Sequence, residues 1–587
     1  MKKFLPDLIA ILAFIILSFA YFFPADIEGR ILFQHDTAAG VGAGQESKEY
    51  LERTGERTRW TNSIFGGMPT YQMSPSYDST TSLKGVEKVY RLFLPDYVVL
   101  TFIMMLGFYI LLRAFGISAW LAGLGGVIWA FSSYFFILIP SGHIWKFVTL
   151  AYIPPTIAGV VLAYRKKYLL GGIVTALFIA LQIQSNHIQM SYYFMFVILF
   201  FVGAYFEDAY KKKELPHFFK ASGVLALAAV VGVCINISNL YHTYEYSKET
   251  MRGKSELKQE GAAASQTSSG LDRDYITNWS YGIGETLTLL VPNVKGGGSG
   301  STMSQSEAAM AKANPMYNGI YSQLPQYFGE QPWTAGPLKW ALLGATIFSI
   351  LLSWGKNFMG LTDFFIDYVP MYNKFRAVSS ILVIAEFTIP LLAIFALKEI
   401  LSKPDMLKQE KNCRGVIAAL VLTAGVAFIL AVAPGAFFSS FITAQEMTAL
   451  KQALPAEHLA SFVANLTEMR EAIIASDAWR SFFIIVIGCL FLFLYQLRKL
   501  KASFTLAGIA LLCLIDMWSV NKRYLNDEQF VPKSKRSEAF VKTQADEIIL
   551  QDTTPNYRVL NFIGFPGNTF NENNTAYWHK SVGGYHA

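Results

Sequence analysis

Residues 147–186 read FVTLAYIPPTIAGVVLAYRKKYLLGGIVTALFIALQIQSN, and this stretch decides the fold class. Its two apolar segments, 147–163 and 168–186, are each close to the roughly 20 residues that an α-helix needs to cross a bilayer. A short basic turn at 164–167 joins them. Because Lys and Arg collect in the short cytoplasmic loops of membrane proteins, the stretch predicts two antiparallel membrane helices with a cytoplasmic turn.

The composition of the whole chain agrees with this interpretation. The 587 residues are 53% hydrophobic and 16% charged, and the mean hydropathy is +0.34. Soluble globular proteins carry about 25% charged residues, so the sequence predicts an integral membrane protein. The net charge of +7 does not indicate nucleic-acid binding, because the cations sit mainly in short loops. The four cysteines lack disulfide-pair and metal-ligand spacing.

Apolar runs of similar length recur along the chain and predict a bundle of about thirteen transmembrane helices. These runs are 4–23, 97–114, 117–139, 147–163, 168–186, 190–206, 217–237, 338–354, 357–370, 378–397, 415–433, 480–496 and 503–519. With a cytoplasmic N-terminus, every short basic cluster falls on one side, which supports the short ninth run. The first run ends in aromatics and Pro24 without a cleavage signal, so we expect an uncleaved anchor.

This topology places nearly all hydrophilic mass on the extracytoplasmic side. We expect a transmembrane domain over 1–519 and the start of a soluble region, itself incomplete, over 520–587. The large outer segments are 24–96, 238–337 and 434–479. In the last region, Tyr557–Phe562 has the pattern of a strand.

Two outer segments carry amphipathic helical patterns. Val86, Val89, Tyr90 and Phe93 recur at helical spacing, with charged residues on the other face. Such a helix lies in the membrane interface or packs on the bundle, and the pattern leaves both open. A second pattern over 459–473 predicts a helix that caps or rims the outer cavity.

The stretch Phe33–Gly40 follows the first apolar run and opens the first outer loop. Its carboxylate, Asp36, stands just beyond the bilayer, where it can act on a group held at the membrane surface. We expect Asp36 to be the reactive centre, as a general base that deprotonates an acceptor hydroxyl. The alternative is an ordinary solvated loop aspartate.

Further polar groups fall on the same predicted face as Asp36. They are His35, His143, Lys146, Asn186, His187, His242, Glu245, Glu285, Lys374 and Arg376. Cations here can stabilise a departing lipid phosphate, and we expect Arg376 and Lys374 to bind it, with His143 and Lys146 as second choices. The other residues are candidates for binding substrate. Structural hydrogen bonds or contacts to lipid head groups are the alternatives. No metal site is predicted, because the histidines lack HxxxH or HxH spacing.

Five pieces of sequence resemble a known family. They are the Asp36 stretch, Phe65–Pro69, Ser141–His143 with Lys146, Gln184–His187 and Asn373–Arg376. The arrangement resembles the GT-C superfamily of membrane glycosyltransferases, and more closely the YfhO-like bacterial membrane proteins, over most of the chain.

The resemblance implies a GT-C-like helical bundle in the bacterial inner membrane, with an extracytoplasmic active site. It implies a polyprenyl-phosphate sugar as donor, and a cell-envelope glycopolymer, glycolipid or protein as acceptor. Attack opposite the leaving phosphate would invert the anomeric centre. Many GT-C enzymes carry paired acids in the first loop, whereas here His35 precedes Asp36 and the next acid is Glu46. Whether a divalent cation takes part therefore stays open.

Two other classes of function fit the same composition. A transporter or flippase for lipid-linked saccharides would carry polar groups at membrane depth, and Glu386 and the run 182–189 are the candidates. A non-catalytic envelope assembly factor could use the soluble C-terminal region instead.

Overall fold

The computed structural model describes residues 4–73, 77–253, 270–298, 302–328, 341–438, 440–538, 540–554, 556–563 and 569–585. Within them the regular structure is helical apart from four strands of two residues each. Contacts divide the chain into two compact units. Unit 1 comprises Met1–Lys258, Ser268–Gly270 and Asn521–Ala587, and unit 2 comprises Gln259–Thr267 and Leu271–Val520.

Nine helices in the described residues are long and apolar enough to cross a membrane. They are α1 (Leu5–Phe22), α4 (Asp96–Ala114), α7 (Ile144–Tyr164), α9 (Ile188–Lys211), α10 (Leu215–Ile235), α17 with its preceding turn (Val378–Ser402), α18 to α19 (Glu410–Val432), α21 (Ala456–Gln496) and α22 (Ala502–Asn521). These helices confirm the prediction of an all-α polytopic membrane protein. The count of thirteen crossings stays a prediction.

Two expected spans are shorter or broken in the structure. The run 117–139 forms α5 (Ala119–Ala130) and α6 (Ser133–Leu138), because Ser132 takes an extended backbone conformation between them. The run 357–370 contains the ten-residue helix α16 (Met359–Tyr368). At 1.5 Å per residue, such a helix is about 15 Å long, roughly half the hydrocarbon thickness of a bilayer. It is too short to cross by itself.

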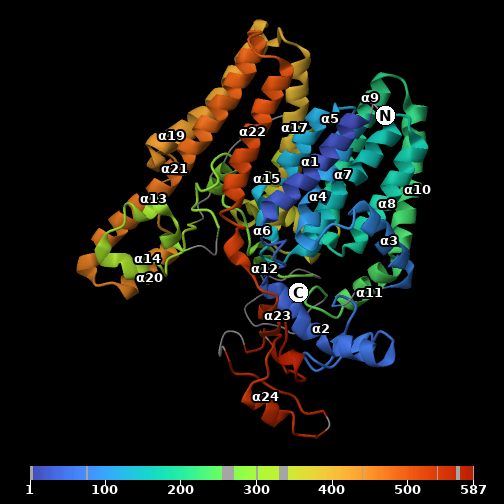
Figure 1. Cartoon of the computed structure of the whole chain (residues 1–587), viewed down its shortest axis with the longest axis vertical. Coiled ribbons are helices and arrows are strands. Elements are labelled where there is room, and N and C mark those ends of the chain that lie inside the picture. The colour runs from blue at the N-terminus through green and yellow to red at the C-terminus, as the bar shows by residue number, and fades with distance from the viewer. Residues whose placement is uncertain are drawn as a thin grey trace. The chain divides into compact units, whose positions relative to one another are not determined.

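The membrane part of unit 1 is a bundle in which α7 packs against α4 and α8 (Tyr168–Gln184), and α10 packs against α8 (Figure 1). Helix α7 is continuous although it contains Pro154 and Pro155. Pro155 has no N–H to donate to the Ala151 carbonyl. Gly107 of α4 faces that carbonyl closely enough that a Cβ would lie 2.5 Å from its oxygen. Only glycine allows this approach, which covers the polar group that the proline leaves open.

The outer part of unit 1 joins the first loop to the C-terminal segment (Figure 1). Strand β1 (Ile31–Leu32) pairs antiparallel with β4 (Phe530–Val531). The Ser581 N–H donates to the Ser63 carbonyl at 2.8 Å. The predicted strand Tyr557–Phe562 is wrong, since Val559 forms only an isolated bridge with Ser581. The described residues between 521 and 585 therefore fold onto the first loop, and among them no separate sheet forms.

Other elements complete the outer part of unit 1. They are α2 (His35–Thr54), the hairpin of β2 (Trp60–Thr61) and β3 (Met68–Pro69), α3 (Thr81–Tyr90), α11 (Ile237–Ser247), α23 (Ser534–Glu538) and α24 (Gln544–Ile549). The amphipathic pattern beginning at Val86 is helical in α3 as far as Tyr90, whereas Phe93 lies beyond the helix in a left-handed conformation. Its Leu83 is buried, whereas Val86 and Val89 are exposed.

Unit 2 is organised on α21, a single helix of 41 residues. Helix α19 (Val426–Val432) packs along it, and α15 (Ala341–Ser353) packs along α17 (Val383–Ser402). Its remaining α-helices are α12 (Arg273–Thr277), α13 (Glu307–Met310), α14 (Asn318–Tyr321) and α20 (Ala444–Ala453). The predicted amphipathic helix over 459–473 is the first half of α21. Its apolar side, including Phe462 and Leu466, packs in a core with Tyr317 and Tyr321.

Candidate functional site

Asp36 lies in the first turn of α2, where the sequence predicted a loop. Gln34, which immediately precedes α2, is extended and buried. The Thr37 hydroxyl donates to the side-chain oxygen of Gln34 at 2.7 Å. The Gln34 amide also donates to the carbonyl of Ile139. The side chains of His35 and Asp36 lie outside the described part of the structure. The start of α2 is nevertheless anchored next to the turn that carries His143 and Lys146.

Basic groups from the starts of two helices, α7 and α9, gather at that turn. His143 immediately precedes α7, Lys146 lies in the first turn of α7, and His187 immediately precedes α9. The Lys146 ammonium stands 5.3 Å from the centre of the Tyr134 ring. Lys146, His143 and Arg252 all lie close enough to His187 to influence its charge. The structure therefore brings together three of the predicted site residues.

His187 is held in its neutral form. Burial lowers the pKa of its imidazole to about 3, and the charge of Lys146 acts in the same direction. Its Nδ1 atom is buried and has no hydrogen-bond partner among the described residues. A neutral imidazole with a free nitrogen can accept or donate a hydrogen bond, depending on its tautomer.

Asn186 belongs to a closed ring of four polar side chains beside this turn. It donates to Gln72 at 2.8 Å and accepts from Asn239 at 3.1 Å. Gln72 donates to the Thr243 hydroxyl, which in turn donates to Asn239 at 3.3 Å. Asn186 has φ = 60°, a left-handed conformation that Asn tolerates better than most residues. The ring ties the first loop and α11 to the α8–α9 turn.

His242 and Glu245 on α11 have local partners. His242 donates from Nδ1 to the Ser238 carbonyl at 2.6 Å, and its ring lies 4.7 Å from the Tyr71 ring and 5.7 Å from the Tyr77 ring. Glu245 pairs with Lys248 at 2.7 Å on the same helix. These contacts favour a structural role for His242 in an aromatic cluster.

The predicted phosphate ligands belong to unit 2. Arg376 donates from one terminal nitrogen to the Tyr275 hydroxyl at 2.6 Å, and its guanidinium lies 5.6 Å from that ring. Lys374 lies in the same turn, and partial burial lowers the pKa of its amine. Because the two residues and Asp36 belong to different units, their assignment to one site stays a prediction.

Glu285, also in unit 2, is buried in a polar cluster of its own. Its carboxylate accepts from the Gly282 N–H at 3.0 Å and from the Tyr327 hydroxyl. The nearby Lys295 is buried as well, with its ammonium 4.3 Å from the centre of the Phe438 ring. Burial lowers the pKa of Lys295, while Glu285 acts against this effect.

Sequence reasoning missed Gln72, Arg252 and Lys295. Gln72 lies three positions after the turn-rich stretch 60–69, and this position was the only sequence feature that pointed to a role for it. Arg252 borders a Gly- and Ser-rich segment, so no sequence pattern indicated that it lies near the site. Lys295 directly follows the largely apolar stretch Leu287–Val294, and that position was its only sequence signal.

The fold and the site define the class: an all-α integral membrane protein with a polar cluster where α2, α7 and α9 begin. Comparison of the chain with protein-family models, curated proteins and solved structures finds no match. In the described residues, no three His, Cys, Asp or Glu side chains gather in a metal-binding arrangement.

Proposed function

We propose that this protein is a membrane glycosyltransferase. It transfers a sugar from a polyprenyl-phosphate donor to an extracytoplasmic acceptor of the bacterial cell envelope, namely a glycopolymer, glycolipid or protein. Asp36 is the general base that takes the proton of the acceptor hydroxyl as that oxygen attacks the anomeric carbon. The sugar–phosphate bond breaks on the opposite face, so the configuration inverts.

The observation that carries the proposal is the bond from Gln34 to the Ile139 carbonyl. It fixes the beginning of α2, two residues before Asp36, beside the turn of His143 and Lys146. In this proposal the Asp36 carboxylate and the cations serve opposite ends of the reaction. The carboxylate accepts the proton, and the cations stabilise the negative charge that develops on the departing phosphate.

The neutral His187 is suited to bind the sugar that reacts between the Asp36 carboxylate and the cations. Because the pKa of His187 is lowered to about 3, its imidazole stays uncharged across the physiological pH range. An uncharged imidazole can hydrogen-bond a sugar hydroxyl without adding a second positive charge next to Lys146. The guanidinium of Arg376 is a planar fork that matches phosphate oxygens, and its role as a ligand of the donor phosphate stays a prediction.

Helix α3 provides a surface for the lipid part of the donor. Val89 and Phe93, in and just after this helix, are 61% and 76% exposed. Lys84 and Lys88 precede them on the same helix and are also exposed. Exposed apolar residues beside lysines favour the membrane interface, where a polyprenyl chain stays in the bilayer while its head group reaches the site.

The test is transfer by the purified full-length protein in vesicles that contain a labelled polyprenyl-phosphate sugar and cell-envelope acceptor. We expect Asp36→Asn to reduce transfer about 100-fold or more, as loss of a general base does, with unchanged folding. The matched control is Glu49→Gln on the same helix, whose exposed carboxylate accepts a hydrogen bond from the Gln45 amide. It should keep full activity.

The competing functions give different results in the same vesicles. Movement of label across the bilayer without transfer to acceptor would identify a flippase. Full transfer by Asp36→Asn would remove Asp36 as the base. Rescue of a deletion strain by Asp36→Ala would indicate a non-catalytic assembly factor.

A further inference from the structure

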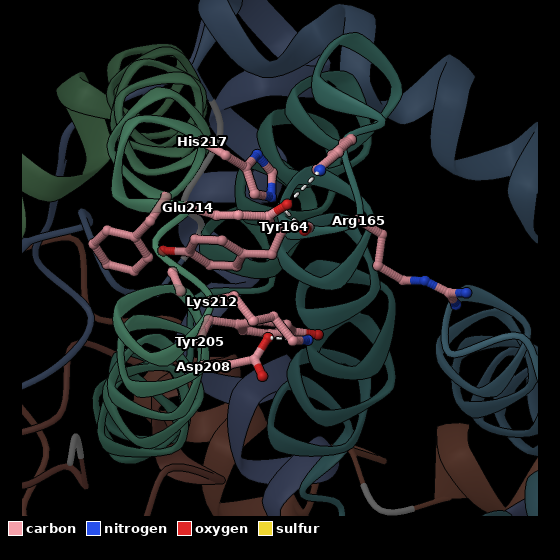
Figure 2. A pocket seen from close by; sticks show the side chains of 10 residues that line it. Tyr164, Arg165, Tyr205, Asp208, Lys212, Glu214 and His217 are labelled. Carbon is pink, nitrogen blue, oxygen red and sulfur yellow. Dashed lines mark hydrogen bonds and ion pairs between the residues drawn. The ribbon is translucent and has the colours of Figure 1, made fainter.

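A pocket lies in unit 1 at the far ends of the same helices. Helix α7 (Ile144–Tyr164) begins after His143 and α9 (Ile188–Lys211) begins after His187, so their last turns are about 30 Å from the candidate site. A cavity of about 320 Å³ opens there, where the first turn of α10 meets them. Figure 2 looks into it.

The floor of the pocket is a column of aromatic rings. Tyr164 stacks on Tyr205 with ring centres 4.5 Å apart, and on Phe218 with centres 5.5 Å apart. The Tyr164 hydroxyl is 2.9 Å from the Ser222 hydroxyl, and His217 bonds both the Tyr168 hydroxyl and the Tyr164 carbonyl. These contacts hold the column rigid, so the cavity is part of the fold.

Two lysines line the pocket, and each has N–H donors beyond the one used in its ion pair. Lys166 pairs with Glu214 at 3.0 Å, and Lys212 pairs with Asp208 at 2.8 Å (Figure 2). A lysine ammonium has three N–H donors, so each can still bind a phosphate oxygen. Arg165 points away from the cavity and donates to the Ala114 carbonyl at 2.5 Å.

The surroundings of the pocket are positive. The turns 165–167 and 211–213 hold six cations, whereas the neighbouring acids are Glu207, Asp208 and Glu214. This excess of three positive charges attracts an anion, and the positive-inside rule puts this end in the cytoplasmic leaflet. Exposed apolar side chains also lie next to the pocket and would meet acyl chains: Leu169, Leu170, Phe206, Tyr210 and Phe219.

We propose that this pocket binds the phosphate of an anionic phospholipid from the surrounding bilayer. Lys166 and Lys212 donate to the phosphate oxygens, the glycerol rests on the Tyr164–Tyr205 column, and the acyl chains pass over Leu169 and Phe219. Basic pockets between transmembrane helices on the cytoplasmic side are a recurrent form of lipid recognition. A free phosphate would use the same donors but would gain nothing from the apolar surroundings.

The test uses native mass spectrometry of the full-length protein in detergent with added phosphatidylglycerol. We expect the double variant Lys166→Gln/Lys212→Gln to bind the lipid about tenfold more weakly, because two charge-assisted contacts are lost. The matched control is Lys167→Gln/Lys213→Gln, which removes the same charge from the same two turns outside the pocket lining. It should bind as the parent does.

Three results would overturn the proposal. Equal binding by the two double variants would show that general surface charge attracts the lipid. Equal affinity of the parent for phosphatidylethanolamine would show that the head group's net charge is not recognised. Displacement of bound lipid by millimolar inorganic phosphate would assign the pocket to a soluble phosphate. Thermal melting of each variant in detergent checks folding. We expect each variant to have a melting temperature within a few degrees of that of the parent protein.

Discussion

Arg470 is a residue on which the stability of unit 2 depends. Its side chain is fully buried, it binds both carboxylate oxygens of Glu446 at 2.6 and 3.1 Å, and it donates to the Phe441 carbonyl at 2.5 Å. Taking a charge out of water costs several kcal/mol unless a partner compensates it. The carboxylate and carbonyl oxygens supply that compensation, so the burial of Arg470 depends on Glu446.

Removing one partner of this pair should be strongly destabilising. We expect Arg470→Met to lower the free energy of unfolding by about 3 kcal/mol, because Glu446, whose side chain is only 18% exposed, would lose its cation. Thermal unfolding in detergent measures the loss. Arg414→Met is the control, since the pair of Arg414 and Glu410 is 78% exposed on both sides and should contribute under about 1 kcal/mol. Equal losses in both variants would contradict the prediction.

The same pair sets a pH dependence. Burial by itself would raise the pKa of Glu446, but Arg470 and Thr443 outweigh burial and hold that pKa below its ordinary value of about 4.5. A carboxyl whose pKa is lowered by folding stabilises the protein fully above the unfolded-state pKa. This contribution disappears as the pH falls through the folded-state pKa. The melting temperature of the parent should therefore fall more steeply below pH 4.5 than that of Glu446→Gln.

At the scale of elements, small residues let the helices of unit 1 approach one another. Gly159 of α7 faces α8 so closely that a Cβ there would lie 2.6 Å from the Thr175 nitrogen and 2.9 Å from the Gly171 oxygen. Backbone atoms cannot move aside cheaply, so the helices would have to separate. Lipid offers no hydrophobic drive for association, and close packing of this kind is what holds membrane helices together.

A methyl group at this crossing should disrupt the bundle. We expect Gly159→Ala to destabilise the protein by about 1–3 kcal/mol through overpacking, although alanine is the better helix former. Gly223→Ala on α10 is the control, because nothing lies within 4 Å of a Cβ at that site. It should be neutral or slightly stabilising in the same melting experiment. A neutral Gly159→Ala would mean that the two helices can separate at no cost.

At the scale of the whole molecule, the question is which ends of the helices share a membrane face. The two ends of α7, and likewise of α9, should lie on opposite sides of the membrane. We expect Ser141→Cys to react with an impermeant thiol reagent in intact cells and Lys211→Cys to react only after permeabilisation. The background replaces Cys234, Cys413, Cys489 and Cys513 with serine. Labelling of both positions from one side would reject the topology.

Only part of the site could be predicted from the sequence. Polar residues next to apolar runs indicated His143, Lys146 and His187, because the end of a membrane span is a local property. Their proximity to the start of α2 depends on Gln34 and Ile139, which are 105 positions apart. The pairing of Glu446 with Arg470 and the ring of Gln72, Asn186, Asn239 and Thr243 likewise join distant segments. No local sequence pattern predicts such contacts.

The sequence by itself determined that this is a helical membrane protein, because the need to satisfy backbone hydrogen bonds in lipid leaves a long apolar segment little choice but a helix. It also determined where most helices lie, from runs of apolar residues and their basic flanks. The tertiary structure alone decided that residues 521–587 fold onto the first loop through the pairing of Ile31 with Val531. It also decided that α21 continues unbroken through its polar and apolar halves. Such choices depend on which surfaces become buried together, and that is a property of the assembled chain rather than of any segment.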